Sequence, residues 1–209
     1  MRVFILSLSF IITIVVTGCG MPGGGNVGSE SGMTAWQAAY TEFLEIPAKY
    51  AEEGHYAGDF TIADMDGDGM PELILSYFNG VEGGSIFANI YIYDGKVKRV
   101  DRGLDMYYKS CYVSDDAELP GLFVSGGRNG TFACNYWYIE DGVVVEQPVW
   151  TDACDFESGQ QKYKVLTDDK RLADAGFKIR IDDQTHMEEV RFFALDKTGI
   201  LTGLSLYGN

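Results

Sequence analysis

Four acidic side chains at regular spacing are the feature of this sequence that most clearly indicates chemistry. Asp64, Asp66 and Asp68 stand at alternate positions, and Glu72 completes a nine-residue loop with acidic groups at positions 1, 3, 5 and 9. Calcium takes roughly six to eight oxygen ligands, and alternating carboxylates in a tight turn can surround one point. Without a cation, carboxylates this close repel one another. The spacing therefore predicts a Ca²⁺ site over residues 64–72.

The other residues of the loop suit the same interpretation. Gly67 and Gly69 permit a tight backbone with positive φ, Met70 would supply its main-chain carbonyl oxygen as a ligand, and Pro71 would stiffen the exit. We expect the ion to be structural, holding a loop between strands. The alternative is a solvated acidic turn that binds no metal.

The loop departs from an EF-hand and resembles a different calcium loop. An EF-hand needs a bidentate Glu at position 12 and a following helix, whereas position 12 here is Leu75 in an apolar run. The residues resemble the D-x-[DN]-x-D-G-x-x-D loop of FG-GAP and VCBS repeats, which runs directly into a strand. Four residues are in register with it: Asp64, Asp66, Asp68 and Gly69. Glu72 stands where the family more often has Asp. The resemblance implies an integrin-type, blade-like β-repeat in an exported protein.

The N-terminal residues indicate export and anchoring. Residues 3–16 are apolar except for three hydroxyl side chains, too short for a span of about 20 residues but typical of a secretory signal. The sequence Val-Thr-Gly-Cys at 16–19 resembles the bacterial lipoprotein cleavage box. This resemblance implies a signal peptide over 1–18 and lipid attachment to Cys19; the alternative is a plain signal peptide with a coincidental cysteine. Residues 19–33 would form a flexible Gly-rich linker.

One helix and then many strands are expected to position the loop. Thr34 begins a T-x-x-Q capping box, and one helical face carries Trp36, Tyr40, Phe43 and Leu44, before Pro47 ends the helix. We expect this helix to cover an edge or a face of a sheet. From about residue 57, alternation of apolar and polar residues predicts strands, with Asp-Gly turns at 94–95 and 141–142. The main expected strands are 72–78, 86–93, 96–100, 131–140 and 143–146.

The C-terminal part carries three further expectations. A short helix is predicted over 169–175, stopped by Gly176, and alternation at residues 177–181 predicts a strand. Residues 189–195 and 200–206 flank Asp-Lys-Thr-Gly and predict a final hairpin.

An internal similarity suggests duplication. Residues 73–97 align with 122–144, including both Asp-Gly turns. Because residues 114–120 precede the second unit without alternating carboxylates, we expect no second ion there. The expected fold is mainly β with an N-terminal helix, built from antiparallel blade-like repeats that resemble a propeller fragment or a sandwich, in a single domain over 34–209.

Composition and the remaining residues narrow the function. The chain has 31 acidic and 16 basic residues, a net charge of −15, which repels nucleic-acid backbones. It contains no P-loop, H-E-x-x-H, G-x-S-x-G or dinucleotide motif, so no catalytic residue is assigned. Of Cys111, Cys134 and Cys154, two can form one disulfide; Cys134–Cys154 and Cys111–Cys134 are equally defensible.

An aromatic-rich middle region has two interpretations. Its rings could stack on sugars, or pack cores and cross-strand pairs, which is the commoner use of such residues in a small β protein. The region comprises Tyr107, Tyr108, Tyr112, Tyr136, Trp137, Tyr138 and Trp150.

These features predict a non-catalytic, calcium-binding, lipid-anchored protein of the cell envelope. Cys19 would hold it on the outer face of the cytoplasmic membrane, or in the outer membrane of a Gram-negative source. Its expected partners are the membrane and an extracellular protein or glycan. The alternatives are an extracellular hydrolase of polymers, acting through unrecognised acidic residues, and a purely structural envelope protein.

Overall fold

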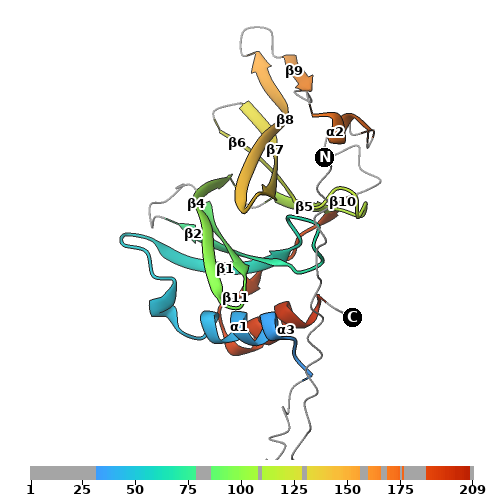
Figure 1. Ribbon diagram of the computed structural model, residues 1–209. Coiled ribbons are helices and arrows are strands. Elements are labelled where there is room, and N and C mark those ends of the chain that lie inside the picture. The colour runs from blue at the N-terminus through green and yellow to red at the C-terminus, as the bar shows by residue number, and fades with distance from the viewer. Residues whose placement is uncertain are drawn as a thin grey trace, which may run out of the picture. The chain divides into compact units, whose positions relative to one another are not determined.

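The computed structural model describes residues 32–78, 86–107, 110–128, 131–155, 160–165, 169–174, 176 and 187–207. The described residues are mainly β and form two antiparallel sheets with a few helices (Figure 1). The signal peptide, Cys19 and most of the linker lie outside them. So does the strand expected at residues 177–181.

The first sheet has the strand order β11-β1-β2-β3-β4. The bounds of its strands are β1 Tyr56–Ala63, β2 Glu72–Phe78, β3 Ile86–Tyr93, β4 Val97–Tyr107 and β11 Phe193–Ala194. Residues 94–96 link β3 and β4, and Gly95 has a φ of 68° at the expected Asp-Gly turn.

The second sheet has the order β10-β5-β6-β7-β8-β9. The bounds of its strands are β5 Ser110–Ser114, β6 Leu122–Arg128, β7 Thr131–Glu140, β8 Val143–Asp155, β9 Gln160–Val165 and β10 Met187–Glu189. Asp141 and Gly142 both have positive φ, 53° and 74°, in the turn between β7 and β8. Such a turn matches the twist of the strands it joins.

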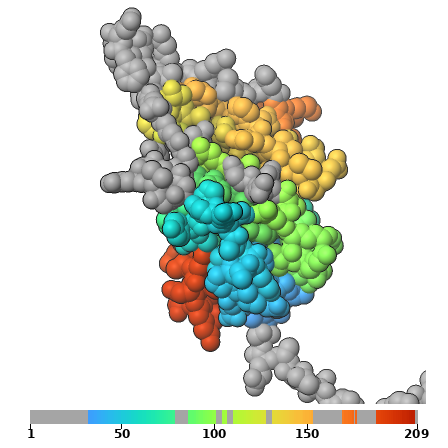
Figure 2. All heavy atoms as spheres, turned by 90° about the vertical axis from the view of Figure 1, so that its left-hand side faces the viewer, coloured from blue at the N-terminus to red at the C-terminus, as the bar shows by residue number. Residues whose placement is uncertain are grey.

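The N-terminal helix forms as expected. In α1 (Ala35–Leu44), the Thr34 backbone N–H donates to Gln37 Oε1 at 2.7 Å and the Gln37 N–H donates to Thr34 Oγ1 at 3.4 Å, which completes the capping box. Pro47 begins the short 3₁₀ helix η1 (Pro47–Lys49). Figure 2 shows these residues (blue) at the surface between the C-terminal residues (red) and β4 (green).

Three apolar clusters form the interior. One lies between α1 and the first sheet, where Tyr40 and Leu44 pack with Leu75 and Tyr91. The second is shared by both sheets and includes Ile90 from the first, Trp137 from the second and Met65 from the loop between β1 and β2. The third contains residues of β6, β7 and β8 together with the single buried residue of α2 (Lys170–Asp174), Leu172.

The expectation of a final hairpin was wrong. Residues 197–205 form a helix, α3 (Lys197–Ser205), in which the Asp196 side chain accepts a hydrogen bond from the Gly199 backbone N–H at 2.7 Å. The Asp-Lys-Thr-Gly sequence is therefore a helix N-cap and not a turn. Gly203 lets α3 pack closely, since a Cβ there would lie 2.8 Å from the rings of Phe60 and Phe193. The short helix expected near residue 170 is confirmed as α2.

Candidate metal centre

The acidic loop joins the first two strands of the first sheet. β1 ends at Ala63, β2 begins at Glu72, and these two residues face each other across the antiparallel pair. The first and last acidic residues of the loop are therefore brought together by strand pairing. This confirms that the loop runs directly into a strand.

Most carboxylates of the loop accept hydrogen bonds from its own backbone. Asp64 accepts from the N–H groups of Gly67 and Gly69 at 2.7 and 3.0 Å. Asp66 accepts from the Asp68 N–H at 3.1 Å, and Asp68 accepts from the Met70 N–H at 2.7 Å. Gly67 and Gly69 have φ values of 81° and 83°, which confirms the positive φ expected at both. The turn is thus wound tightly around its own acidic side chains.

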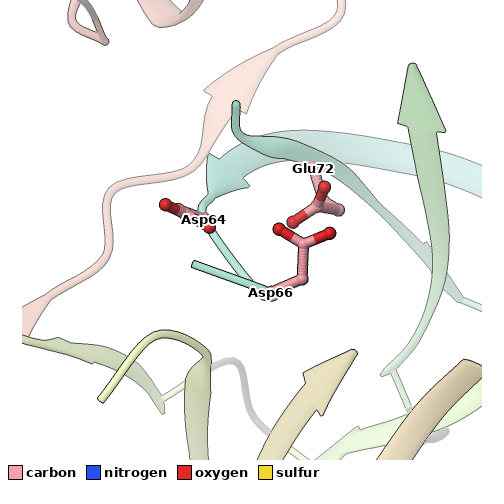
Figure 3. Close-up of side chains that lie close together, drawn as sticks. All are labelled: Asp64, Asp66 and Glu72. Carbon is pink, nitrogen blue, oxygen red and sulfur yellow. The ribbon is translucent and has the colours of Figure 1, made fainter. Parts of the chain in front are cut away.

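Three of the predicted ligands converge. Asp64, Asp66 and Glu72 each place one carboxylate oxygen within 4.8 Å of the others. The carboxylates of Asp66 and Glu72 face each other, and Asp64 lies beside them at the end of β1 (Figure 3). Oxygens that share one Ca²⁺ at about 2.4 Å lie no more than about 4.8 Å apart. The spacing of these three oxygens therefore meets one geometric condition for sharing a cation.

The other two predicted ligands occupy different places. Asp68, which is exposed, is outside the group of three carboxylates. Met70 is half-buried, and its backbone N–H is used by Asp68. Asp68 therefore does not belong to the convergent group of carboxylates.

Glu72 is the most buried member of the group. Its side chain is 4% exposed, and its Oε2 accepts a hydrogen bond from the Met65 N–H at 2.7 Å. Burial, aided by the charges of Asp66 and Asp64, raises the pKa of Glu72 to about 8. Burial also raises the pKa of Asp66 above its usual value. Near neutral pH, Glu72 therefore retains a proton for much of the time unless a cation replaces it.

Tyr40 of α1 contacts the end of the loop that leads into β2. Its hydroxyl contacts the carbonyl oxygens of Pro71 and Tyr91, at 3.2 Å each. Burial, followed by the nearby charge of Glu72, raises the pKa of Tyr40 well above its usual range. The Tyr40 hydroxyl is therefore a neutral hydrogen-bond donor beside the acidic group. Its bond to the Pro71 carbonyl oxygen links α1 to the loop.

The loop is also tied to distant parts of the chain. The Asp64 carbonyl oxygen accepts from the Gly121 N–H at 2.9 Å, and the Met65 carbonyl oxygen accepts from the Ile139 N–H at 2.8 Å. The Asp64 N–H donates to the Tyr207 hydroxyl at 3.0 Å. Gly121, Ile139 and Tyr207 were not expected at the site, because no local pattern in the sequence signals contacts over such separations.

The corresponding loop of the second sheet, residues 115–121, has a different arrangement. The Asp116 N–H donates to Ser114 Oγ and the Glu118 N–H donates to Asp116 Oδ1, at 3.0 Å each. Asp115, Asp116 and Glu118 are exposed. Within the described part of the chain, the only group of three acidic, His or Cys side chains close enough to hold a metal is the one at Asp64.

The cysteines expected to form a disulfide lie in the second sheet. Cys111 and Cys134 are both buried, and Cys134 carries a free thiol, so it forms neither of the two disulfides considered from the sequence. Burial raises the pKa of the Cys134 thiol to about 12. The side chain of Cys154 lies outside the described residues.

The aromatic-rich region is largely interior. Tyr136 and Trp137 are fully buried, and Tyr138 and Trp150 are nearly so. Tyr136 stacks on Phe123 with ring centres 4.7 Å apart. These rings therefore pack the core and are not available to stack on a sugar. Tyr112 is half-buried, and the side chains of Tyr107 and Tyr108 lie outside the described residues.

Comparison with protein-family models, with curated protein sequences and with solved structures finds no significant match for this chain. Among the helices in the described ranges, none has the length and apolar character needed to cross a membrane.

Proposed function

We propose that this chain is a non-catalytic, calcium-binding, lipid-anchored protein of the cell envelope, in which Ca²⁺ has a structural role. The observation that carries the proposal is the convergence of Asp64, Asp66 and Glu72 oxygens within 4.8 Å, at a point where Glu72 is almost completely buried. A divalent cation would neutralise these carboxylates and remove their mutual repulsion. Asp64, Asp66 and Glu72 would bind it first, and Asp68 and the Met70 carbonyl oxygen would complete the shell.

The structural role follows from where the loop is attached. Its backbone bonds to Gly121 and Ile139 in the second sheet's part of the chain and to Tyr207 near the C-terminus. Fixing the conformation of the loop would therefore stabilise contacts between segments far apart in sequence. A cation here would stabilise the folded conformation and would not take part in a reaction.

We also infer that the two sheets are related units of one blade-like repeat. In each sheet, an edge strand from residues 187–194 pairs with a strand that leads through a loop into an antiparallel meander. The meander is β2-β3-β4 in one sheet and β6-β7-β8 in the other, with an Asp-Gly turn before the last strand of each. This correspondence supports the duplication proposed from the sequence and its resemblance to FG-GAP and VCBS repeats.

The envelope assignment rests on the sequence. Cys19 in its cleavage box would carry the lipid, and the Gly-rich linker would hold the folded part clear of the membrane. The strongly acidic composition argues against nucleic-acid binding. The expected partner is an extracellular protein or glycan.

The alternative, a hydrolase of extracellular polymers, is less well supported. A general acid with a raised pKa beside a second carboxylate is a known arrangement for glycoside hydrolysis, and Glu72 beside Asp66 resembles it. Glu72, however, is only 4% exposed, so its carboxyl group is not placed to donate a proton to a substrate in an open cleft. An acid that a polymer cannot reach is a better metal ligand than a catalyst.

Calorimetric titration of Ca²⁺ into residues 33–209 tests the proposal. All three apolar clusters lie within this part, which forms one unit by its internal contacts. We expect one ion per chain with a Kd of about 10⁻⁴ to 10⁻³ M, as in other extracellular calcium modules. Asp66→Asn, which keeps an acceptor for the Asp68 N–H, should abolish binding.

The matched control for that variant is Asp116→Asn in the second loop, which removes the same charge and should leave calcium binding unchanged. Absence of binding heat from the wild-type protein, or equal binding by the wild-type and Asp66→Asn proteins, would overturn the metal assignment.

A further inference from the structure

A cavity of about 660 Å³ lies beside the acidic loop. Residues of the β1–β2 loop and of the β5–β6 loop form its two sides, while the segment 188–193 and the end of the chain around α3 close it. Its volume is within the range of roughly 300–1,000 Å³ that small-molecule sites occupy. The cavity is separate from the buried face of Glu72, which does not line it.

The interior of the cavity is mostly apolar. Ile62 from β1, Val113 from β5 and Val190 from the segment between β10 and β11 contribute aliphatic side chains, and Leu119 and Pro120 come from the second loop. Ile62 and Leu119 are buried, so their positions are fixed by the surrounding core. Such a surface gains free energy by covering an apolar group of a ligand.

The polar part of the lining is strongly acidic. Four acidic residues line the cavity, Asp64, Asp68, Asp116 and Glu188, against a single basic residue, Arg191, which gives the lining a formal charge of −3. The Arg191 guanidinium lies over the Phe193 ring, 5.1 Å from its centre. Asp68, Asp116 and Glu188 are exposed, so a ligand in the cavity can approach them from the solvent.

Bound calcium would not reverse this charge. The loop carries four carboxylates and Ca²⁺ carries two positive charges, so the loaded loop keeps a formal charge of −2. Asp116 and Glu188 are outside the metal loop altogether. A cavity with low-dielectric walls and one sign of charge concentrates ligands of the opposite sign and repels those of its own.

We propose that this cavity binds a small organic cation, with an ammonium or guanidinium group among the rim carboxylates and an apolar body against Ile62, Val113 and Val190. The proposal goes beyond the calcium site, with which the cavity shares Asp64 and Asp68, while Asp116 and Glu188 belong to the cavity alone. The charge of the lining excludes anionic metabolites as the preferred ligands, and the apolar interior disfavours a bare metal ion or a simple sugar.

Three probes that share one body and differ only in the head group test the proposal: phenylbutylamine, phenylbutanol and phenylbutyrate. Each is titrated into residues 33–209, with calcium and with chelator, while methyl resonances of Ile62, Val113, Leu119 and Val190 are followed by NMR. We expect the amine to shift these resonances and to bind at least about threefold more tightly than the alcohol, with the carboxylate weakest.

A charge-neutralising pair of substitutions identifies the groups responsible. Asp116→Asn with Glu188→Gln should weaken binding of the amine by about threefold or more and leave that of the alcohol unchanged. The control, Glu45→Gln with Glu53→Gln, removes the same charge at exposed positions that do not line the cavity and should have a smaller effect. The proposal fails if amine and alcohol bind equally, if the shifts fall outside the cavity, or if both pairs act alike.

Discussion

The two loops that lead into β2 and β6 stand at equivalent places in the strand order of their sheets and are held by different contacts. Residues 64–71 lead from β1 to β2, and their Asp64 and Asp66 converge with Glu72, whereas residues 115–121 lead from β5 to β6 and hold no such group of carboxylates. The second loop is instead fixed by Leu119, which is 2% exposed, and by the Tyr136 hydroxyl donating to the Pro120 carbonyl oxygen.

The first loop combines a fully buried apolar side chain, Met65, with a cluster of carboxylates, whereas the second combines buried Leu119 with exposed acidic side chains. An apolar anchor such as Leu119 is stable in any ionic condition, because its stabilisation comes from removal of its surface from water. A carboxylate cluster is stable only when protons or a cation neutralise it. We therefore expect the first loop to respond to pH and to cations more strongly than the second.

The largest expected effect on stability comes from substitution of Gly121, whose backbone N–H joins the second loop to Asp64 of the first. Gly121 has a φ of 125°, and a Cβ there would lie 2.6 Å from the Trp137 carbonyl oxygen. Gly121→Ala should lower the free energy of unfolding by about 2–4 kcal/mol through steric clash and backbone strain. Gly69→Ala, at a φ of 83° with open space around it, should cost only about 1–2 kcal/mol. Denaturant melts that show equal losses would contradict the description of this contact.

Removal of the apolar anchor should have a similar or slightly smaller effect. Leu119→Ala leaves a cavity in the third apolar cluster, so we expect a loss of about 2–4 kcal/mol in the free energy of unfolding. The loss should be the same in millimolar calcium and in chelator, since no charge is altered. A loss that depends on calcium would mean that the two loops are not fixed by separate means.

An effect of comparable size is expected from pH. The pKa of Glu72 is about 8 in the folded protein against an ordinary value of 4.5, so the folded state holds the proton more strongly between these values. This contribution to stability is complete below about pH 4.5 and is lost as pH rises through 8. Without calcium, the melting temperature should therefore fall from pH 5 to pH 8.

Two comparisons isolate the contribution of Glu72 to that profile. Glu72→Gln, which keeps the size and the acceptor for the Met65 N–H, should flatten the fall with pH. Saturating calcium should flatten it as well, because the ion replaces the proton. An unchanged profile in Glu72→Gln would place the titrating group elsewhere.

Local features of the fold were predictable because their signals are local. The capping box at Thr34, the strand 86–93, the strand 131–140 and the Asp-Gly turns each depend on residues close in sequence, and each is confirmed. The prediction of a final hairpin was wrong because it too relied on a local signal, which fits more than one structure. Asp196 three residues before Gly199 suits a turn or a helix N-cap, and the close packing of Gly203 against Phe60 and Phe193, which accompanies the helix, is not visible in the local sequence.

The candidate site was partly predictable. The alternating acidic residues and the glycines between them indicated a loop that gathers carboxylates, and Asp64, Asp66 and Glu72 do converge. Glu72 is buried at the point where its strand pairs with Ala63 of β1, which is a contact between segments separated by the whole loop. The links to Gly121 and Tyr207 depend on how the whole chain folds, so no spacing within the loop could reveal them.

The location of a bound cation tests the central claim most directly. Crystals of residues 33–209 grown with millimolar calcium chloride should show, by anomalous scattering, a single ion about 2.3–2.6 Å from oxygens of Asp64, Asp66 and Glu72. Residues 115–121 should hold none. Calcium-grown crystals in which these three carboxylates diverge with no ion between them would contradict the account.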